Sequence, residues 1–169
     1  SFALSLSVHA GETRYSEHIQ PIFTEKCVAC HACYDSPCQL NLGSGEGLER
    51  GAHKQPVYNG GRTKAQQTTR LFIDARQTEQ WREKGFFDVL NPGQPQASLL
   101  ASMLELGKAQ PFAANSRLPD DLVLGVARKE ECPAPSEFGN YAQKNPHNGM
   151  PFAVTGLTDE QYAKIKQWL

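Results

Sequence analysis

Two cysteines and a histidine near the N-terminus carry the clearest chemistry in this sequence. Cys27, Cys30 and His31 form the pattern C-x-x-C-H, in which the histidine directly follows the second cysteine. At this spacing one helical turn presents both sulfurs on the same side, where they can form thioethers with the two vinyl groups of a haem. The adjacent imidazole is then held beneath the iron. The pattern therefore predicts one covalently bound haem c, attached through Cys27 and Cys30 and ligated by His31.

A zinc site is the alternative use of the same residues. Cys33 and Cys38 follow closely and could nominally complete a set of zinc ligands with the first two cysteines. Haem is the favoured interpretation because a second signal of a haem protein lies near the other end of the chain. There, Gly149-Met150-Pro151 precedes a short loop and a segment that can begin a helix.

The segment from Leu157 to Leu169 is predicted to be an amphipathic helix. Thr158 is followed three residues later by Gln161, which makes a capping box, and Leu157 and Tyr162 are placed as its hydrophobic staple. The apolar residues of this helix form a single stripe, made of Tyr162, Ile165, Trp168 and Leu169. We therefore expect the helix to pack against the rest of the protein.

The order of these features resembles that of a class I cytochrome c: an N-terminal helix ending in C-x-x-C-H, a Met-Pro loop and an amphipathic terminal helix. The resemblance implies a mainly α fold around one haem, with His31 as proximal and Met150 as distal ligand of the iron. A long insertion of loops and helices separates the two motifs. Met150 could instead fill core space, as methionines commonly do. The other candidates for the distal position are Met103, His9, His18, His53 and His147.

Within the insertion, local signals predict short helices joined by turns. The expected elements are an initial helix over residues 18–26, a brief extended segment over 39–43, a short helix from Leu48, and one or two helices between 69 and 84 that Gly85 ends. Apolar residues at helical spacing predict a packed core helix over 99–106, which also gives Met103 a structural role. Residues 111–146 are rich in Pro, Asn, Asp and Glu and are expected to be mainly loop.

Length and composition fit one haem-centred unit. A chain of 169 residues with 39% apolar residues can bury a core. Its formal net charge of -1 argues against nucleic acid as a partner, and no segment approaches the ~20 apolar residues that cross a bilayer. Residues 1–10 resemble the end of a signal peptide, with Val8-x-Ala10 as a small-residue cleavage pattern. We expect residues 11–169 to form a single periplasmic domain.

Three cysteines lie outside the C-x-x-C-H pattern, and the oxidising periplasm favours a disulfide between two of them. Cys33 and Cys38 flank a turn-forming stretch that could bring them within bridging range. A bond from either of them to Cys132 would close a much longer loop. The sequence alone does not determine which of these pairings forms. The cysteine that remains could be a reactive thiol near the haem edge.

The residues around the haem motif narrow the family. Cys33-Tyr34-Asp35-Ser36-Pro37-Cys38, directly after the motif, is an addition that ordinary cytochromes c do not need. With it, the sequence resembles the N-terminal part of the bacterial fatty acid cis/trans isomerases. The likeness continues at Glu46-Gly47-Leu48, Thr69-Arg70-Leu71-Phe72, Trp81-Arg82, Gly85-Phe86, Val89-Leu90-Asn91 and Gly149-Met150-Pro151. Members of that family are several times longer, so the chain resembles their haem domain, either joined to a larger C-terminal part or as a stand-alone relative.

The resemblance implies an enzyme that converts cis double bonds in the acyl chains of membrane phospholipids to trans. The haem iron would be its reactive centre, and no catalytic side chain is assigned. The alternatives are an electron-transfer cytochrome c, in which His31 and Met150 stay bound to the iron throughout, and a haem sensor that regulates an attached domain. Incubation with cis-unsaturated phospholipid, followed by analysis of the fatty acids, separates the isomerase from the carrier.

Overall fold

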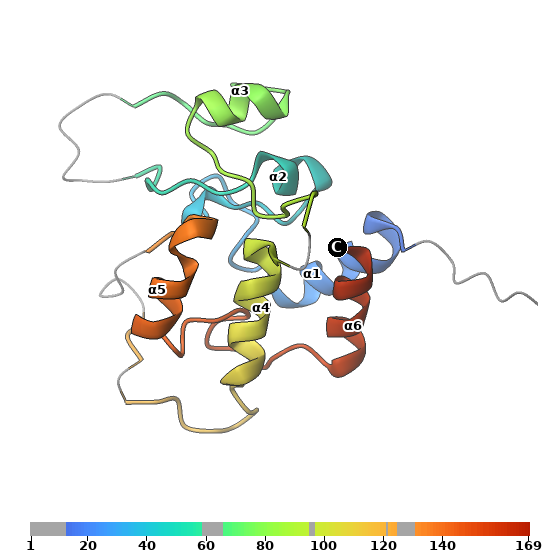
Figure 1. Ribbon diagram of the computed structural model, residues 1–169, viewed down its shortest axis with the longest axis vertical. Coiled ribbons are helices and arrows are strands. Elements are labelled where there is room, and N and C mark those ends of the chain that lie inside the picture. The colour runs from blue at the N-terminus through green and yellow to red at the C-terminus, as the bar shows by residue number, and fades with distance from the viewer. Residues whose placement is uncertain (1–12, 59–65, 95–96, 121, 125–130) are drawn as a thin grey trace, which may run out of the picture.

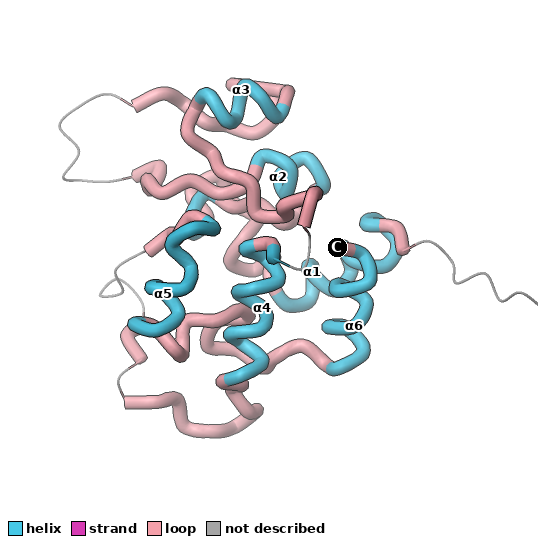
Figure 2. The backbone as a smooth tube through the Cα atoms, viewed as in Figure 1, coloured by secondary structure: helices cyan, strands magenta, loops and turns pink. Residues whose placement is uncertain are grey.

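The computed structural model describes residues 13–58, 66–94, 97–120, 122–124 and 131–169, and the regular structure within these ranges is helical (Figures 1 and 2). No strand occurs there, and extended pairing is limited to isolated β-bridges. The predicted mainly α class is therefore confirmed. The predicted signal-peptide remnant and His9 lie outside the described residues. The elements are η1 (Tyr15–Ile19), α1 (Gln20–Lys26), η2 (Pro37–Gln39), α2 (Gly45–Arg50), α3 (Thr78–Glu83), α4 (Leu99–Ala109), η5 (Pro135–Glu137), α5 (Phe138–Lys144) and α6 (Asp159–Trp168).

The N-terminal helical segment, η1 followed by α1, leads directly into the C-x-x-C-H motif. Its inner face is apolar, and Ile19, Ile22 and Phe23 are buried in the main core. Pro21 lies in the first turn of α1, at the junction where the wider helical turn of η1 passes into the α-helix. The helix predicted over residues 18–26 is confirmed, and helical structure already begins at Tyr15.

The terminal helix α6 has the predicted N-cap and packs beside the N-terminal segment. The backbone N–H of Gln161 donates to Thr158 Oγ1 at 3.1 Å, and the Gln161 side chain accepts from the Thr158 N–H at 3.0 Å. Trp168 lies against Tyr15 and Phe23, with ring centroids 5.5 and 6.5 Å apart. The two ends of the described chain therefore meet in one aromatic cluster, and the predicted apolar stripe supplies the contact (Figure 1).

Helix α4 supplies much of the central core. Ser98 caps it by accepting from the Ala101 N–H at 3.0 Å, and Leu99, Leu100 and Leu104 are buried. Met103 is partly buried against the same core. The predicted core helix is thus confirmed and extends to Ala109.

Helices α2 and α3 lie together at one end of the molecule, away from α4 and α6 (Figure 1). Only Thr78–Glu83 is helical between residues 69 and 84, and the positive φ of Gly85 (91°) turns the chain away. Residues 39–43 join no strand. The described residues between 111 and 146 are mainly loop, as expected, except for η5 and α5 near the end of the segment. The rings of Phe138 and Tyr141 in α5 lie 6.4 Å apart between centroids.

Candidate functional site

The C-x-x-C-H motif forms a hydrogen-bonded turn at the end of α1. The N–H groups of Cys30 and His31 both donate to the carbonyl of Cys27, at 3.0 and 2.9 Å. Cys27 is partly buried and packs against the main core, Cys30 is exposed, and neither belongs to a disulfide. Burial, reinforced by Cys30, raises the pKa of the Cys27 thiol to about 12. Both cysteines therefore lie on one turn, with Cys27 against the apolar core and Cys30 open to solvent.

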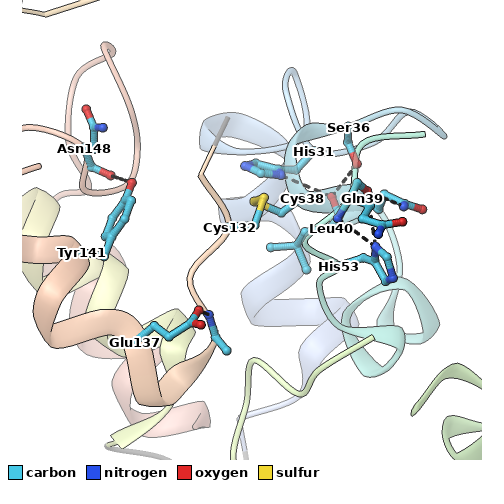
Figure 3. The surroundings of a disulfide bond; sticks show 12 residues. His31, Ser36, Cys38, Gln39, Leu40, His53, Cys132, Glu137, Tyr141 and Asn148 are labelled. Atoms are coloured by element: carbon cyan, nitrogen blue, oxygen red, sulfur yellow. Dashed lines mark hydrogen bonds between the residues drawn. A yellow bond between two sulfur atoms is a disulfide. The ribbon is translucent and has the colours of Figure 1, made fainter. Parts of the chain in front are cut away.

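The ring of His31 is buried and held in one orientation. Its Nδ1–H donates to the carbonyl of Leu40 at 3.2 Å, and that carbonyl also accepts from the Ser36 hydroxyl at 2.8 Å (Figure 3). Because a carbonyl can only accept, Nδ1 must carry a proton, and in the neutral ring the lone pair is then on Nε2. This is the tautomer in which a histidine can bind a metal while a backbone carbonyl fixes its ring.

The loop that holds His31 is tied to a distant part of the chain. Cys38 and Cys132 form a disulfide with 5.5 Å between their Cα atoms, one of the pairings that the sequence left open (Figure 3). Cys33 is exposed and outside any disulfide. Because Cys38 lies two residues before Leu40, the disulfide anchors the segment whose carbonyl orients His31.

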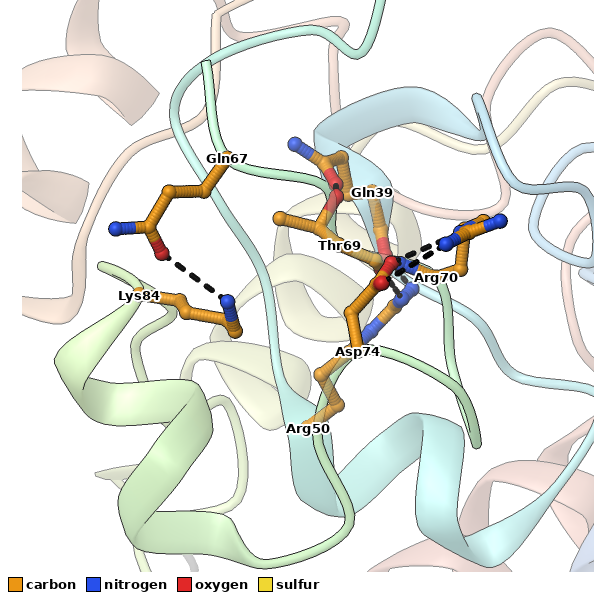
Figure 4. Close-up of polar contacts among 7 residues, drawn as sticks. All are labelled: Gln39, Arg50, Gln67, Thr69, Arg70, Asp74 and Lys84. Carbon is orange, nitrogen blue, oxygen red and sulfur yellow. Dashed lines mark hydrogen bonds and ion pairs between the residues drawn. The ribbon is translucent and has the colours of Figure 1, made fainter.

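A buried arginine, which sequence reasoning missed, supports the same loop from the other side. Arg50 is 1% exposed, and its guanidinium donates to the carbonyls of Thr69, at 2.9 Å, and of Gln39 (Figure 4). It also lies over the rings of Trp81 and Phe86, at 5.5 and 5.0 Å from their centroids. Burial lowers its pKa to about 10, so it remains charged at neutral pH. No local pattern in the sequence marks this residue.

Met150 lies in a loop docked on α4. Its N–H donates to the carbonyl of Met103 at 2.9 Å, and both methionines pack against the main core together with Cys27. The loop approaches the helix so closely that a Cβ on Gly107 would overlap the Met150 carbonyl, and one on Gly149 would overlap the Gly107 backbone. Two glycines thus permit the contact that positions Met150.

Two of the histidines among the distal-ligand candidates, His53 and His18, form hydrogen bonds with the backbone. His53 accepts from the Gln55 N–H through Nδ1 and donates through Nε2 to the carbonyl of Lys84. His18 is exposed and accepts from the Arg14 N–H. For the zinc alternative, the Cys38 sulfur is engaged in the disulfide, and no group of three or more His, Cys, Asp or Glu side chains placed to hold a metal occurs in the described residues.

Comparison with known proteins yields one family. The model of the fatty acid cis/trans isomerase (CTI) family matches residues 66–169, more than half of the chain, including Cys132 and Met150 but not the C-x-x-C-H motif. No curated protein and no solved structure matches. None of the helices in the described ranges is long and apolar enough to cross a membrane.

Proposed function

This chain belongs to the fatty acid cis/trans isomerase family, and on that premise we propose that it is the haem-carrying domain of a periplasmic enzyme that isomerises acyl chains of membrane phospholipids. The family membership supports isomerase activity on fatty acids. The haem, the periplasmic location and the phospholipid substrate are the proposed part. One observation carries the haem: the C-x-x-C-H turn sits at a buried apolar surface with His31 held in its metal-binding tautomer.

The residues present fit a covalent haem better than a zinc ion. Cys27 and Cys30 stand outside any disulfide on one turn, whereas Cys38 is withdrawn from metal binding by its bond to Cys132. Cys27 and Met150 contact the same core, so groups from both motifs border one apolar region. A bound haem would supply an electron-withdrawing iron, which suits a reaction that weakens a C=C π bond without moving a proton. His31 would be its proximal ligand and Met150 its distal one.

We further propose that residues 11–169 form a single domain of the class I cytochrome c type. The contact of α6 with η1 and α1 supports this fold, because the helices at the two ends of the described chain pack through Tyr15, Phe23 and Trp168. Contacts also join the segment that follows the C-x-x-C-H motif to the family-matched segment. They are the Cys38–Cys132 disulfide, the Arg50–Thr69 hydrogen bond and the paired backbone hydrogen bonds between Ala52 and Phe87.

Haem attachment and isomerisation can be tested with the same set of variants. The intact protein is made in a bacterium that assembles c-type cytochromes, and covalent haem is detected by staining after denaturing electrophoresis. We expect stain in the wild type and in Cys33→Ser, the matched control, and none when Cys27 and Cys30 are both serine. Absence of covalent haem from the wild type would overturn the haem assignment.

The activity assay uses vesicles of a cis-unsaturated phospholipid and gas chromatography of the released fatty acids. Wild type and Cys33→Ser should form trans fatty acids, and the variant without Cys27 and Cys30 should not. Covalent haem together with no trans product would instead indicate an electron carrier.

The proposed location is tested by cell fractionation. A periplasmic fraction free of the protein would contradict it.

The distal ligand has its own test, because the Met150 loop is docked on α4 at Met103 and both methionines pack against the main core. Ferric protein should show the near-infrared charge-transfer band of Met-ligated low-spin haem. Met150→Ala should abolish the band, whereas Met103→Ala should keep it. The reverse pattern would assign the iron to Met103.

A further inference from the structure

A turn before α3 presents two neighbouring apolar side chains to solvent. Phe72 is 55% exposed and Ile73 is 66% exposed, and we refer to these two residues as the apolar tip. The residues on either side face inward, because Leu71 and Ala75 pack in the small core around Trp81. The tip is therefore a short protrusion with a buried base, at the end of the molecule that carries α2 and α3 (Figure 1).

The turn beneath the tip is rigidly closed. The carboxylate of Asp74 accepts from the Arg70 N–H at 2.6 Å and from the Arg70 guanidinium at 3.0 Å through each of two nitrogens (Figure 4). The Asp74 N–H donates back to the Arg70 carbonyl at 3.0 Å. These bonds hold the pKa of Asp74 well below its usual range. The Ile73 N–H also donates to the Arg70 carbonyl, at 3.2 Å. Because the backbone of the turn is clamped in this way, the side chains of Phe72 and Ile73 keep their exposed positions.

Two features at the tip are unfavourable for an isolated protein. Phe72 has a φ of 68°, a left-handed conformation that Gly, Asn or Asp adopts more easily than an aromatic residue. The exposed Phe72 ring is also unusual for a turn, where side chains are ordinarily polar or small, because an apolar ring forms no hydrogen bonds with water. Single exposed apolar residues are common on protein surfaces. An adjacent pair on a clamped turn, with a strained backbone at its apex, points to a function for the pair.

We propose that the apolar tip inserts into the surface of a phospholipid bilayer and docks the protein there. A protruding turn suits a fluid layer, which a side chain can enter without a preformed pocket. Aromatic and aliphatic side chains next to arginine are typical of interfacial membrane contacts. Arg70 and Asp74 neutralise each other, and the exposed Arg76 lines the same hollow as Phe72, Glu46 and Glu49. The proposal therefore rests on the apolar side chains and not on a net positive charge. The inference rests on the proposed function in one respect, that the substrate acyl chains are those of a membrane.

The test measures binding of the intact protein to vesicles of phosphatidylcholine, alone and with phosphatidylglycerol, by co-sedimentation. The variant is Phe72→Asn with Ile73→Ser, because asparagine tolerates the left-handed backbone and both positions are exposed. The matched control is Val123→Ser with Leu124→Ser, a second exposed apolar pair (51% and 47%). We expect at least a tenfold loss of partitioning into both vesicle types for the tip variant, from the transfer of two apolar side chains. The control should stay within twofold of wild type.

Equal binding by the tip variant and wild type, or equal losses in the tip variant and the control, would overturn the proposal. The proposal would also be overturned if binding required phosphatidylglycerol and did not change when the tip residues were replaced, because such binding indicates adsorption by charge alone. A Phe72→Trp variant gives a second readout, because its added fluorescence should be quenched by lipids with brominated acyl chains; absence of quenching would likewise overturn insertion. None of these measurements uses isomerase activity. If only the tip proposal is wrong, the wild type still forms trans fatty acids but the tip variant binds vesicles as well as the wild type does. If only the isomerase proposal is wrong, no trans fatty acids form but the tip variant still binds vesicles less well than the wild type.

Discussion

Replacing Cys132 by serine tests how much of the fold depends on the Cys38–Cys132 disulfide. The bond links residues separated by 94 positions. It therefore closes a long loop and lowers the conformational entropy of the unfolded chain. In the chain-entropy description such a loop corresponds to roughly 4–5 kcal/mol of stability at 25 °C. That amount is a large part of the total stability of an ordinary domain, about 5–15 kcal/mol. We therefore expect Cys132→Ser to lower the free energy of unfolding by several kcal/mol.

The measurement is guanidinium-induced unfolding followed by far-UV circular dichroism, with and without reductant. Cys33→Ser is the matched control, since Cys33 is exposed and outside the disulfide. Reductant should destabilise the wild type and Cys33→Ser to about the level of Cys132→Ser, and should leave Cys132→Ser unchanged. The reasoning is refuted if Cys132→Ser and Cys33→Ser unfold at the same midpoint, or if reductant destabilises Cys132→Ser as much as the wild type.

Three other predictions concern buried or clamped groups. Arg50→Lys should lower the unfolding free energy by about 2–4 kcal/mol, because an ammonium lacks the planar fork that reaches both carbonyls and lies over the Trp81 and Phe86 rings, and a buried group left unpaired costs about 1–3 kcal/mol; a change below 1 kcal/mol in chemical denaturation would contradict this. Gly107→Ala should destabilise by about 1–3 kcal/mol through overlap with the Met150 carbonyl, while Gly139→Ala, with open space around it, should be neutral or stabilising in thermal melts. Asp74 has a lowered pKa, so its stabilisation is present above about pH 4 and is lost as pH falls below that value; Asp74→Asn should flatten this part of the stability profile, and an unchanged acid slope would count against it.

Elements with local signals were predictable from the sequence. The capping box of Thr158 and Gln161 and the stripe that follows it define α6 without reference to any other part of the chain. The core helix α4 was predictable for the same reason, since its leucines repeat at helical spacing. Helix α5 was missed because its seven residues include Gly139, Asn140 and only two large apolar side chains, too few for a periodic pattern.

Properties that depend on distant contacts were not predictable. Three cysteines allow several pairings, and only the folded chain shows that Cys132 reaches Cys38. The role of Arg50 follows from rings and carbonyls supplied by residues 39, 69, 81 and 86, none of which lies within its own helix. The pairing of Gly107 with Gly149 is likewise a property of two crossing segments. In each case the informative partner lies more than ten residues away.

These distant contacts converge on one short segment, the loop from Ser36 to Leu40. Its Leu40 carbonyl orients His31, its Cys38 is bonded to the family-matched segment, and its Gln39 accepts from Arg50. Cys38 and Gln39 both have positive φ values, 55° and 50°, which non-glycine residues adopt only where the surroundings hold them. The disulfide and Arg50 provide that hold. It follows that a change at Cys132 should disturb the loop that carries the Leu40 carbonyl, and through that hydrogen bond the orientation of the His31 ring.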